Sequence, residues 1–206
     1  GEVDINVGMT HSEGLVPQLE VLLERTHIQK SELELIAVSR GPGSFTGLRI
    51  GMATAEALAY SLKIPLRAVD TLEAISYNLP VAGVLLVPVL DAQKGNLYVG
   101  QYLWDQGRLE EVEPVSILSQ KEIIPLMEQK DRPVILLGEC HRIPKKEGFL
   151  VAMAPESARM PRASSVAILA QENYEPGDLY DYFGMEPFYI RRSEAEELWE
   201  KRHPSK

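Results

Sequence analysis

A glycine-rich turn holds the residues whose types and spacing could do chemistry. The stretch RGPGSFTGLRIG, residues 40–51, places three glycines within seven residues and then continues into a predicted helix. Backbone N–H groups in such a turn can cradle a phosphate. A P-loop, however, needs Lys and then Ser or Thr after its last glycine, whereas Leu48 and Arg49 follow Gly47. The dinucleotide fingerprint G-x-G-x-x-G also fails, because its last glycine comes one residue too late.

Two uses of this turn stay open. Gly43 and Ser44 could bind an anion, because free N–H groups and the helix dipole lie at any helix N-terminus. Alternatively, the glycines only let the backbone turn sharply and bring a slim helix close to another element.

The helix after the turn, predicted over residues 46–62, carries a row of small side chains. Gly47, Gly51, Ala55 and Ala59 recur at every fourth position and therefore share one ridge of the helix. Gly51 inside a helix costs about 0.5–1 kcal/mol relative to Ala, which close approach by another element would offset. We expect this ridge to be exposed for docking on another protein. The alternative is that it packs against the preceding helix of its own domain.

Other reactive residues do not assemble a reaction centre. The four histidines, none at ligand spacing from another, are His11, His27, His141 and His203. Ser44 does not stand in a G-x-S-x-G nucleophile elbow. Cys140 beside His141 is predicted to be a partly buried structural cysteine rather than a nucleophile.

Three carboxylates are also interpreted as structural. Asp91 is predicted to hold a hairpin turn through its own backbone. Asp70 and Glu73, three residues apart at a predicted helix start, have the spacing of a helix cap. No catalytic residue, metal ligand or cofactor site is therefore predicted.

Composition narrows the class of protein. With 206 residues, 45% hydrophobic and 25% charged, the chain is typical of a soluble globular protein. A net charge of −9 without a basic stripe argues against direct binding of nucleic acid. Cys140 is the only cysteine, which excludes an internal disulfide and a cysteine-clustered zinc site and suits the cytoplasm. No apolar run reaches the roughly 18 residues of a membrane span, and no signal peptide is seen.

The elements that must position these residues fall into two similar series. The first has a strand over 1–7, a helix opened at Thr10 by a capping box with Glu13, and a parallel βαβ unit. The strands of that unit are predicted at 33–39 and 64–69. The second series opens with a hairpin of strands 84–90 and 97–104. Further elements are predicted near 109–115, 120–129, 134–137 and 164–172. With the hairpin, the order of the whole second series is βββαβα.

The first series has the same order without its opening hairpin. We therefore expect an α/β protein of two related halves, residues 1–78 and 79–190. Residues 175–190 are interpreted as an irregular linker, and residues 191–206 as a charged helix that joins the first half.

Five stretches together resemble the bacterial TsaB (YeaZ) family, which is glycoprotease-like in sequence. They are THSEGLVPQLEVLL, RGPGSFTGLRIGMATAEALA, IPLRAVDTLEAIS, VPVLDAQKGNLYVGQY and PFYIRRSEAE. The resemblance covers nearly the whole chain. It implies an actin/Hsp70-type fold of two ribonuclease-H-like halves, of which the first lacks its N-terminal hairpin here. The Asp-Thr-Ser turn of complete family members is absent from this sequence.

The resemblance also implies a function. Such proteins are non-catalytic scaffold subunits that bind the transferase TsaD for threonylcarbamoyladenosine modification of tRNA next to the anticodon. A TsaE-type ATPase joins them, the subunit self-associates, and tRNA is reached only through the complex. The two N-terminal helices would form the interface. The predicted partner-binding residues are Leu15, Leu19, Thr46, Gly47, Ile50, Gly51, Thr54, Ala55, Leu58 and Ala59.

One departure from the paralogous transferase concerns metal binding. TsaD carries an HxxxH metal pair where this chain has Thr71 and Ile75, which cannot supply imidazole ligands. The alternative function is an independent enzyme, either a glycoprotease-like hydrolase or a nucleotide-dependent transferase.

Overall fold

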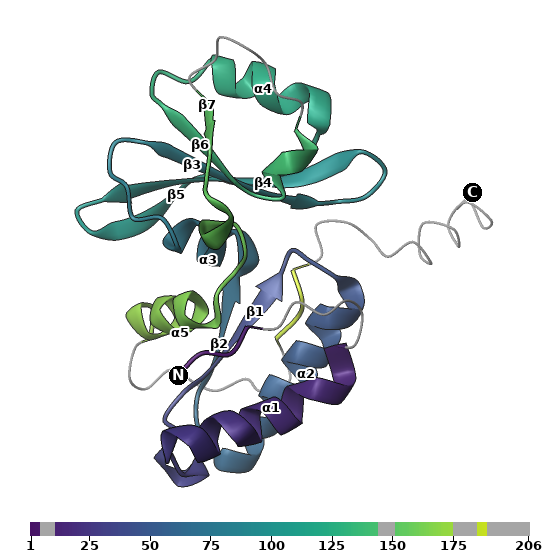
Figure 1. The fold of residues 1–206 in the computed structure, drawn as a ribbon, viewed down its shortest axis with the longest axis vertical. Helices are drawn as coiled ribbons and strands as arrows, with labels where there is room; N and C mark the ends of the chain where they lie inside the picture. Colours follow the sequence, from purple (N-terminus) through teal and green to yellow (C-terminus); the bar gives the residue numbers. More distant parts are fainter. Residues whose placement is uncertain (5–10, 144–150, 175–184, 189–206) are drawn as a thin grey trace, which may run out of the picture.

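The computed structural model describes residues 1–4, 11–143, 151–174 and 185–188. It contains two sheets with helices packed on their faces (Figure 1). The smaller sheet has two strands in the order β1-β2, and the larger has five in the order β5-β4-β3-β6-β7. Among the described helices, none is both long and apolar enough to cross a membrane.

The first half contains the predicted parallel βαβ unit. Its elements are α1 (His11–Thr26), β1 (Ile36–Gly41), α2 (Phe45–Leu62) and β2 (Leu66–Asp70). β1 and β2 pair in parallel, so α2 is the crossover that the sequence predicted. Both strands begin two or three residues later than predicted. A short 3-10 turn (Lys30–Glu32), which was not predicted, separates α1 from β1.

The larger sheet confirms the predicted hairpin. Its elements are β3 (Leu85–Asp91), β4 (Asn96–Asp105), β5 (Arg108–Ser119), α4 (Gln120–Glu128), β6 (Val134–Gly138) and β7 (Val151–Met153). β3 pairs antiparallel with β4 and parallel with β6, so it is the central strand. β5 runs four residues past its predicted end, and β7 was not predicted. The mixed α/β class is therefore confirmed.

α3 (Thr71–Tyr77) lies between the two sheets (Figure 1). Leu72 and Ile75 have no exposed surface and pack with Leu86, Tyr102 and Leu137 of the larger sheet. Ala74 packs on the opposite side, with Val69 of β2. The other face of the larger sheet is covered by α4, through Ile123 and Met127. This seven-residue helix thus contributes buried side chains to two separate core clusters, one on the larger sheet and one beside β2.

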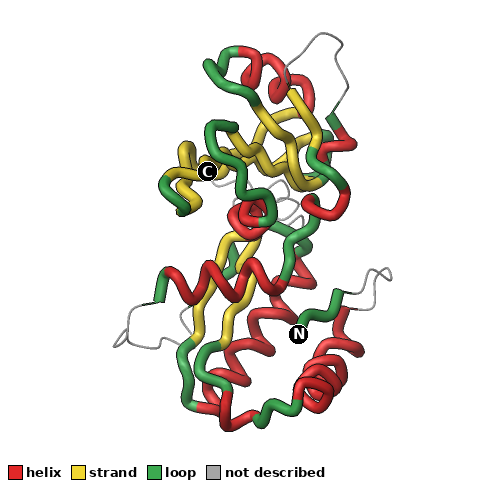
Figure 2. The backbone as a smooth tube through the Cα atoms, turned by 60° about the vertical axis from the view of Figure 1, so that its left-hand side comes forward, coloured by secondary structure: helices red, strands yellow, loops and turns green. Residues whose placement is uncertain are grey.

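The last described helix, α5 (Ala163–Glu172), differs from its predicted place. It was assigned to the second half, but it packs on β1, β2 and α3 of the first. Side chains of β1 alternate between the two layers: Ala37 meets the α5 cluster, whereas Ile36 and Val38 meet α2. Figure 2 shows α5 and α2 on opposite sides of the two strands.

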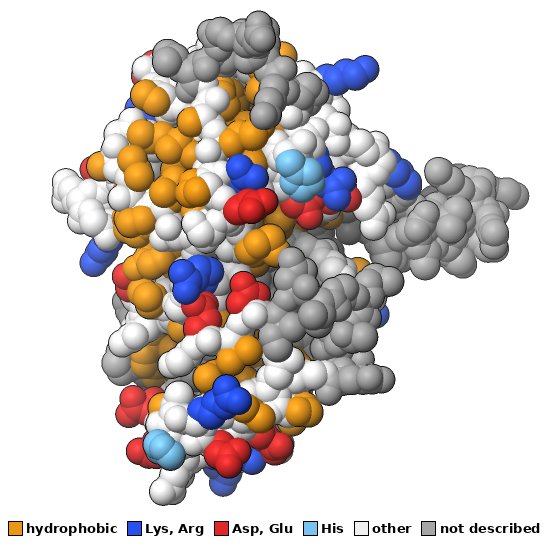
Figure 3. Space-filling model, viewed as in Figure 1, with side chains coloured by type: hydrophobic (Ala, Val, Ile, Leu, Met, Phe, Trp, Pro, Cys, Tyr) orange, Lys and Arg blue, Asp and Glu red, His pale blue; other side chains and the backbone are white. Residues whose placement is uncertain are grey.

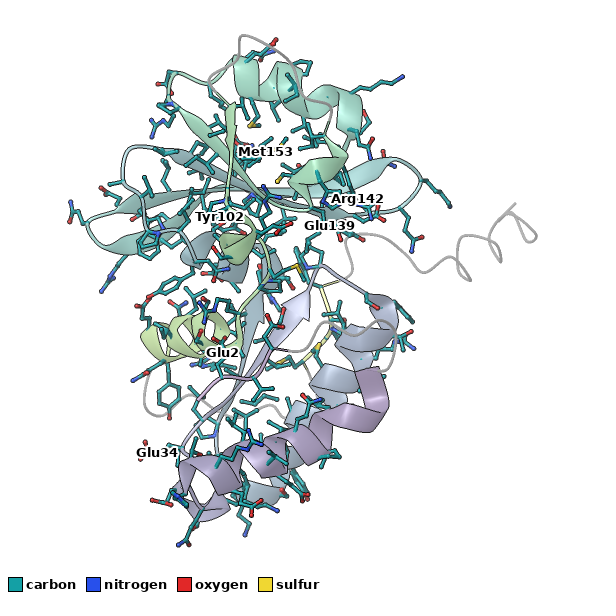
Figure 4. All side chains as sticks on the ribbon, in the orientation of Figure 1. Glu2, Glu34, Tyr102, Glu139, Arg142 and Met153 are labelled. Carbon is teal, nitrogen blue, oxygen red and sulfur yellow. The ribbon has the colours of Figure 1, made fainter. Side chains whose placement is uncertain are left out.

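Residues 1–4, predicted to begin a strand, are not in a strand. Glu2 instead binds the start of α5 (Figure 4). Its Oε1 accepts hydrogen bonds from the backbone N–H and the hydroxyl of Ser164, each at 3.0 Å, and its Oε2 accepts from Arg162. The predicted capping box at Thr10, most of the linker 175–190 and the final helix 191–206 lie outside the described residues.

Replacing Leu72 with Ala should lower the free energy of unfolding by about 2–5 kcal/mol, because the cavity would lie between the two sheets. Urea unfolding followed by circular dichroism measures the change. The control is Ile168→Ala on the 43% exposed position of α5, which should cost less than about 1 kcal/mol. Equal losses in the two variants would contradict the placement of α3 in the core.

Glu2 should make stability depend on acid pH. Hydrogen bonds from Arg162 and from the Ser164 backbone lower the pKa of Glu2 from 4.5 to about 2. Its contribution is therefore complete above pH 4.5 and disappears as pH falls toward 2. Glu2→Gln should lower the free energy of unfolding at pH 7 by less than about 1 kcal/mol, because solvent screens this surface ion pair. Urea unfolding from pH 7 to pH 2 should show this difference shrinking; a difference independent of pH would disprove the assignment.

Candidate functional site

The glycine turn connects the carboxyl end of β1 to the start of α2. Gly41 has a φ of +115°, a conformation that residues with a Cβ rarely adopt. A Cβ there would lie 3.0 Å from Cδ1 of Leu48 and 3.4 Å from the carbonyl oxygen of Phe188. Ser44 is the N-cap of α2, and its hydroxyl oxygen accepts a hydrogen bond from the N–H of Gly47 at 3.4 Å. These contacts account for the turn sequence without a ligand. Anion binding at Gly43 and Ser44, both exposed, stays a prediction.

The row of small residues on α2 is only partly accessible. Ala59 is completely buried and Ala55 is 6% exposed. Both pack with Leu66 and with Met185, on the face of α2 that covers β1 and β2. The expectation that the whole ridge is exposed is therefore wrong at Ala55 and Ala59. The crossover helix must cover its own strands, and small side chains let it lie close to them.

The remaining predicted residues of α2 keep some exposure. Thr46 is exposed, whereas those that are half-buried are Gly47, Ile50, Gly51, Thr54 and Leu58. A Cβ on Gly51 would have no other atom within 4 Å, so this part of the ridge faces open space. The hydroxyl of Thr54 donates to the carbonyl oxygen of Ile50 at 2.8 Å.

The solvent side of α2 carries a second series of small residues, which the sequence analysis missed. Ala53 and Ala57 are exposed, and Tyr60 follows them at 59% exposure. Phe45, 38% exposed, lies at the other end of the helix with the Arg49 guanidinium 4.0 Å from its ring centroid. Alanines occupy every second position from 53 to 59. Arg49 lies one helical turn before Ala53 on the same side of α2. This charged residue is the sequence signal that the side faces solvent.

α1 lies beside α2 and extends the same surface (Figures 1 and 2). Leu15 and Leu19 are half-buried. Val16 and Val21 are 50% and 43% exposed. Figure 3 shows apolar side chains beside charged ones on this end of the molecule. We call the exposed part of α1 and α2 the helix-pair surface; its large apolar members are Val16, Val21, Phe45 and Tyr60.

A polar cluster lies where β1 and β2 meet α3. Nε of Arg40 is 2.5 Å from Oδ1 of Asp70, and the Arg40 guanidinium also lies 5.4 Å from the ring centroid of Phe188. Burial raises the pKa of Glu73, and the charges of Asp70 and Glu111 raise it further. Asp70 is the N-cap residue of α3, as predicted, but its carboxylate binds Arg40 instead of the helix.

Thr71 and Ile75 are structural residues at this place. The Thr71 hydroxyl lies 2.6 Å from the Ser39 hydroxyl, joining α3 to β1. Ile75 is completely buried. In the part of the chain that the structure describes, no three His, Cys, Asp or Glu residues are grouped to hold a metal ion.

The prediction for Asp91 is confirmed, and Cys140 is buried more deeply than predicted. Oδ1 of Asp91 accepts a hydrogen bond from the N–H of Gln93 at 2.8 Å, which holds the turn after β3. Cys140 is completely buried, and burial raises the pKa of its thiol, so it is a poor nucleophile. His141 beside it is exposed.

Residues 6–199 match the model of the family described as TsaD, tRNA N6-adenosine threonylcarbamoyltransferase. A structure from Pseudomonas aeruginosa, described as an uncharacterized protein with similarity to peptidase YeaZ, superposes with a TM-score of 0.75 at 24% identity, over 90% of this chain and 86% of that one. A second, described as YeaZ from the same species, gives 0.70 at 24% identity, over 88% and 86%. The class is therefore that of glycoprotease-like α/β proteins related to TsaD.

Two relatives with assigned names identify the family within this class. The tRNA threonylcarbamoyladenosine biosynthesis protein TsaB of Bacillus subtilis (strain 168) is 34% identical over 197 residues, covering 92% of this chain and 83% of the relative. TsaB of Escherichia coli (strain K12) is 25% identical, covering 93% and 84%. The chain thus belongs to the TsaB (YeaZ) family, as its motifs indicate.

Gly41, at the start of the glycine-rich turn, and Gly51, inside α2, should respond in opposite ways to alanine. Gly51→Ala should raise the free energy of unfolding by about 0.5–1 kcal/mol, because a Cβ there meets open space and alanine favours the helix. Gly41→Ala should lower it, because φ is +115° and Leu48 lies in the way. Thermal unfolding of both variants measures the effects. A destabilised Gly51→Ala chain would show that this position is already in close contact within the chain.

Proposed function

We propose that this chain is a non-catalytic scaffold and activator subunit for threonylcarbamoyladenosine modification of tRNA next to the anticodon. In this proposal it docks on a TsaD-type transferase through the helix-pair surface. The names of its curated relatives support the pathway. The observation that carries the docking role is the exposure of Val16, Val21, Phe45 and Tyr60 on two adjacent helices.

The shape of α2 supports a close helix contact. Exposed Ala53 and Ala57 lie one turn apart, between Phe45 and Tyr60. Small side chains between larger ones let a second helix approach the backbone and place its own ridge in the groove. The interface we propose keeps Leu15, Leu19, Thr46, Gly47, Ile50, Gly51, Thr54 and Leu58 from the prediction. It omits Ala55 and Ala59, which pack inside the chain, and gains Ala53 and Ala57.

The non-catalytic role is supported by the groups at the β2–α3 junction. Thr71 and Ile75 stand where the transferase paralogue carries its metal pair, and both contribute to packing and hydrogen bonding within the chain. The nearby charged groups are engaged too, since Arg40 pairs with Asp70. This arrangement suits a structural junction better than metal-assisted chemistry.

The finer architecture and the remaining partners are part of the proposal. We infer two ribonuclease-H-like halves, predicted as residues 1–78 and 79–190, and we move α5 from the second half to the first. A TsaE-type ATPase would join the complex, and the chain would self-associate when its partner is absent. The net charge of −9 supports tRNA binding mainly by other subunits.

A bulky side chain at Gly51 should block docking. Gly51→Leu fits the isolated chain because its Cβ direction is open, but it would overpack an approaching helix. Ala57→Arg tests the solvent side of α2 by placing a charge in the proposed contact. Size-exclusion chromatography with light scattering, plus calorimetry with the TsaD-type protein, should show at least about tenfold weaker binding for each, or about 1.4 kcal/mol.

The matched control is Ile168→Arg, on exposed α5 at the other side of β1 and β2, which should bind like the unaltered chain. Normal binding by Gly51→Leu and Ala57→Arg would show that the interface is assigned wrongly. If the unaltered chain did not bind the transferase, the scaffold role itself would fail. Turnover of nucleotide or peptide by the isolated chain would favour an independent enzyme.

A further inference from the structure

Charged side chains from both halves of the molecule meet beside α3. Arg40 comes from β1, Asp70 ends β2, and Glu73 lies in the first turn of α3. Glu111 comes from β5 of the larger sheet, which contacts α3. Its partner in the register with β4 is Tyr102, which lies where the larger sheet meets α3 (Figure 4). We call Arg40, Asp70, Glu73 and Glu111 the junction charges.

Negative charge exceeds positive charge at this junction. Arg40 is the single cation among the junction charges, and it pairs with Asp70, whose side chain is 19% exposed. Among the described residues, neither Glu73 nor Glu111 has an ion pair. Glu73 is half-buried, and its carboxylate accepts a hydrogen bond from the backbone N–H of Asp70 at the start of α3. This hydrogen bond holds the carboxylate at the junction.

The described side chains that other elements pack on α3 do not offset the charge of Glu73. β3 and β6 each present a buried leucine to the helix. Tyr102 of β4 is 2% exposed, and burial raises the pKa of its phenol, so it stays neutral at physiological pH. Glu172 of α5 accepts a hydrogen bond from the hydroxyl of Tyr77 at 2.9 Å, on the side of α3 that faces α5.

Ionised Glu73 therefore opposes the contact between the two halves. Glu73 and Asp70 belong to the first half and Glu111 to the second, so repulsion between their charges acts across the junction. Burial raises the pKa of Glu73, the charges of Asp70 and Glu111 raise it further, and the charge of Arg40 lowers it. The repulsion is present above this raised pKa. It is absent below pH 4.5, where the carboxyl is neutral in the folded and the unfolded chain.

We propose that the junction is a proton-sensitive latch, in which α3 packs more firmly on the larger sheet when Glu73 carries a proton than when it is ionised. The two halves are held together by the apolar contacts of Leu72 and Ile75, and the junction charges set how firmly. Acid pH tightens the contact and neutral pH loosens it. This inference concerns the contact between the halves and does not depend on docking through the helix-pair surface.

Hydrogen exchange of α3, measured by mass spectrometry, tests the latch. The protection of residues 71–77, corrected for the intrinsic exchange rate at each pH, should fall by about threefold or more from pH 4 to pH 8. The reference is β3 in the same chain, whose protection should change less. Glu73→Gln keeps the size of the side chain and its hydrogen bond to the helix start, but it cannot ionise. This variant should keep the high protection of α3 at pH 8 and match the unaltered chain at pH 4.

Two variants of β5 show whether the repulsion crosses the junction. Glu111→Gln should also raise the protection of α3 at pH 8, and should add little when combined with Glu73→Gln, because the two groups interact. The matched control is Glu110→Gln, the next residue of the strand, whose register partner Leu103 packs on the opposite face of the sheet. It should leave α3 unchanged. The proposal is overturned if α3 and β3 respond alike to pH in the unaltered chain, or if Glu110→Gln acts as strongly as Glu111→Gln.

Discussion

The burial of α3 is the constraint on which the rest of the structure depends. This helix has seven residues, too few to be stable by itself, so packing on both sides must stabilise it. Leu72 and Ile75 pack on the face of the larger sheet that is turned toward the first half. Ala74 packs in the cluster formed by β2 and α5. Because α3 begins at the residue after β2, the carboxyl end of β2 is held against the second half. The polar groups at that end, Arg40 and Asp70 among them, are positioned by the same packing.

A second consequence concerns the two-stranded sheet. Parallel strands need cover on both faces, and here α5 supplies one layer and α2 the other. α2 can approach closely because Ala55 and Ala59 face the strands. Alanines at 53 and 57 leave the opposite side of the same helix equally narrow. Small side chains therefore make α2 narrow on both sides. One side packs on β1 and β2, and the other is exposed.

Much of this arrangement could be predicted from local sequence. Period and turn signals predicted the βαβ unit, the hairpin and the cap residue of α3, because each depends on neighbours along the chain. The predicted exposure of the ridge was wrong at Ala55 and Ala59, because alternating alanines put small residues on both sides of a helix and spacing alone does not choose between the two sides. β7 has three residues, too few to show a period. The place of α5 and the contact of Glu2 with Ser164 depend on residues far apart in sequence.

If the helix-pair surface docks as proposed, charge influences which kind of partner it favours. Apolar burial contributes about 25 cal/mol per Å², with no preference for one partner over another. Electrostatics supplies that preference, because a self-dimer brings together two chains that each carry a net charge of −9. A partner with a basic rim would be attracted to the same surface, and its association would be faster at low salt. Screening at physiological ionic strength reduces the self-repulsion but not the apolar contact, since the Debye length there is about 8 Å. In the proposed complex, self-association and docking on a different protein would therefore use the same helices, while charge would favour the different protein.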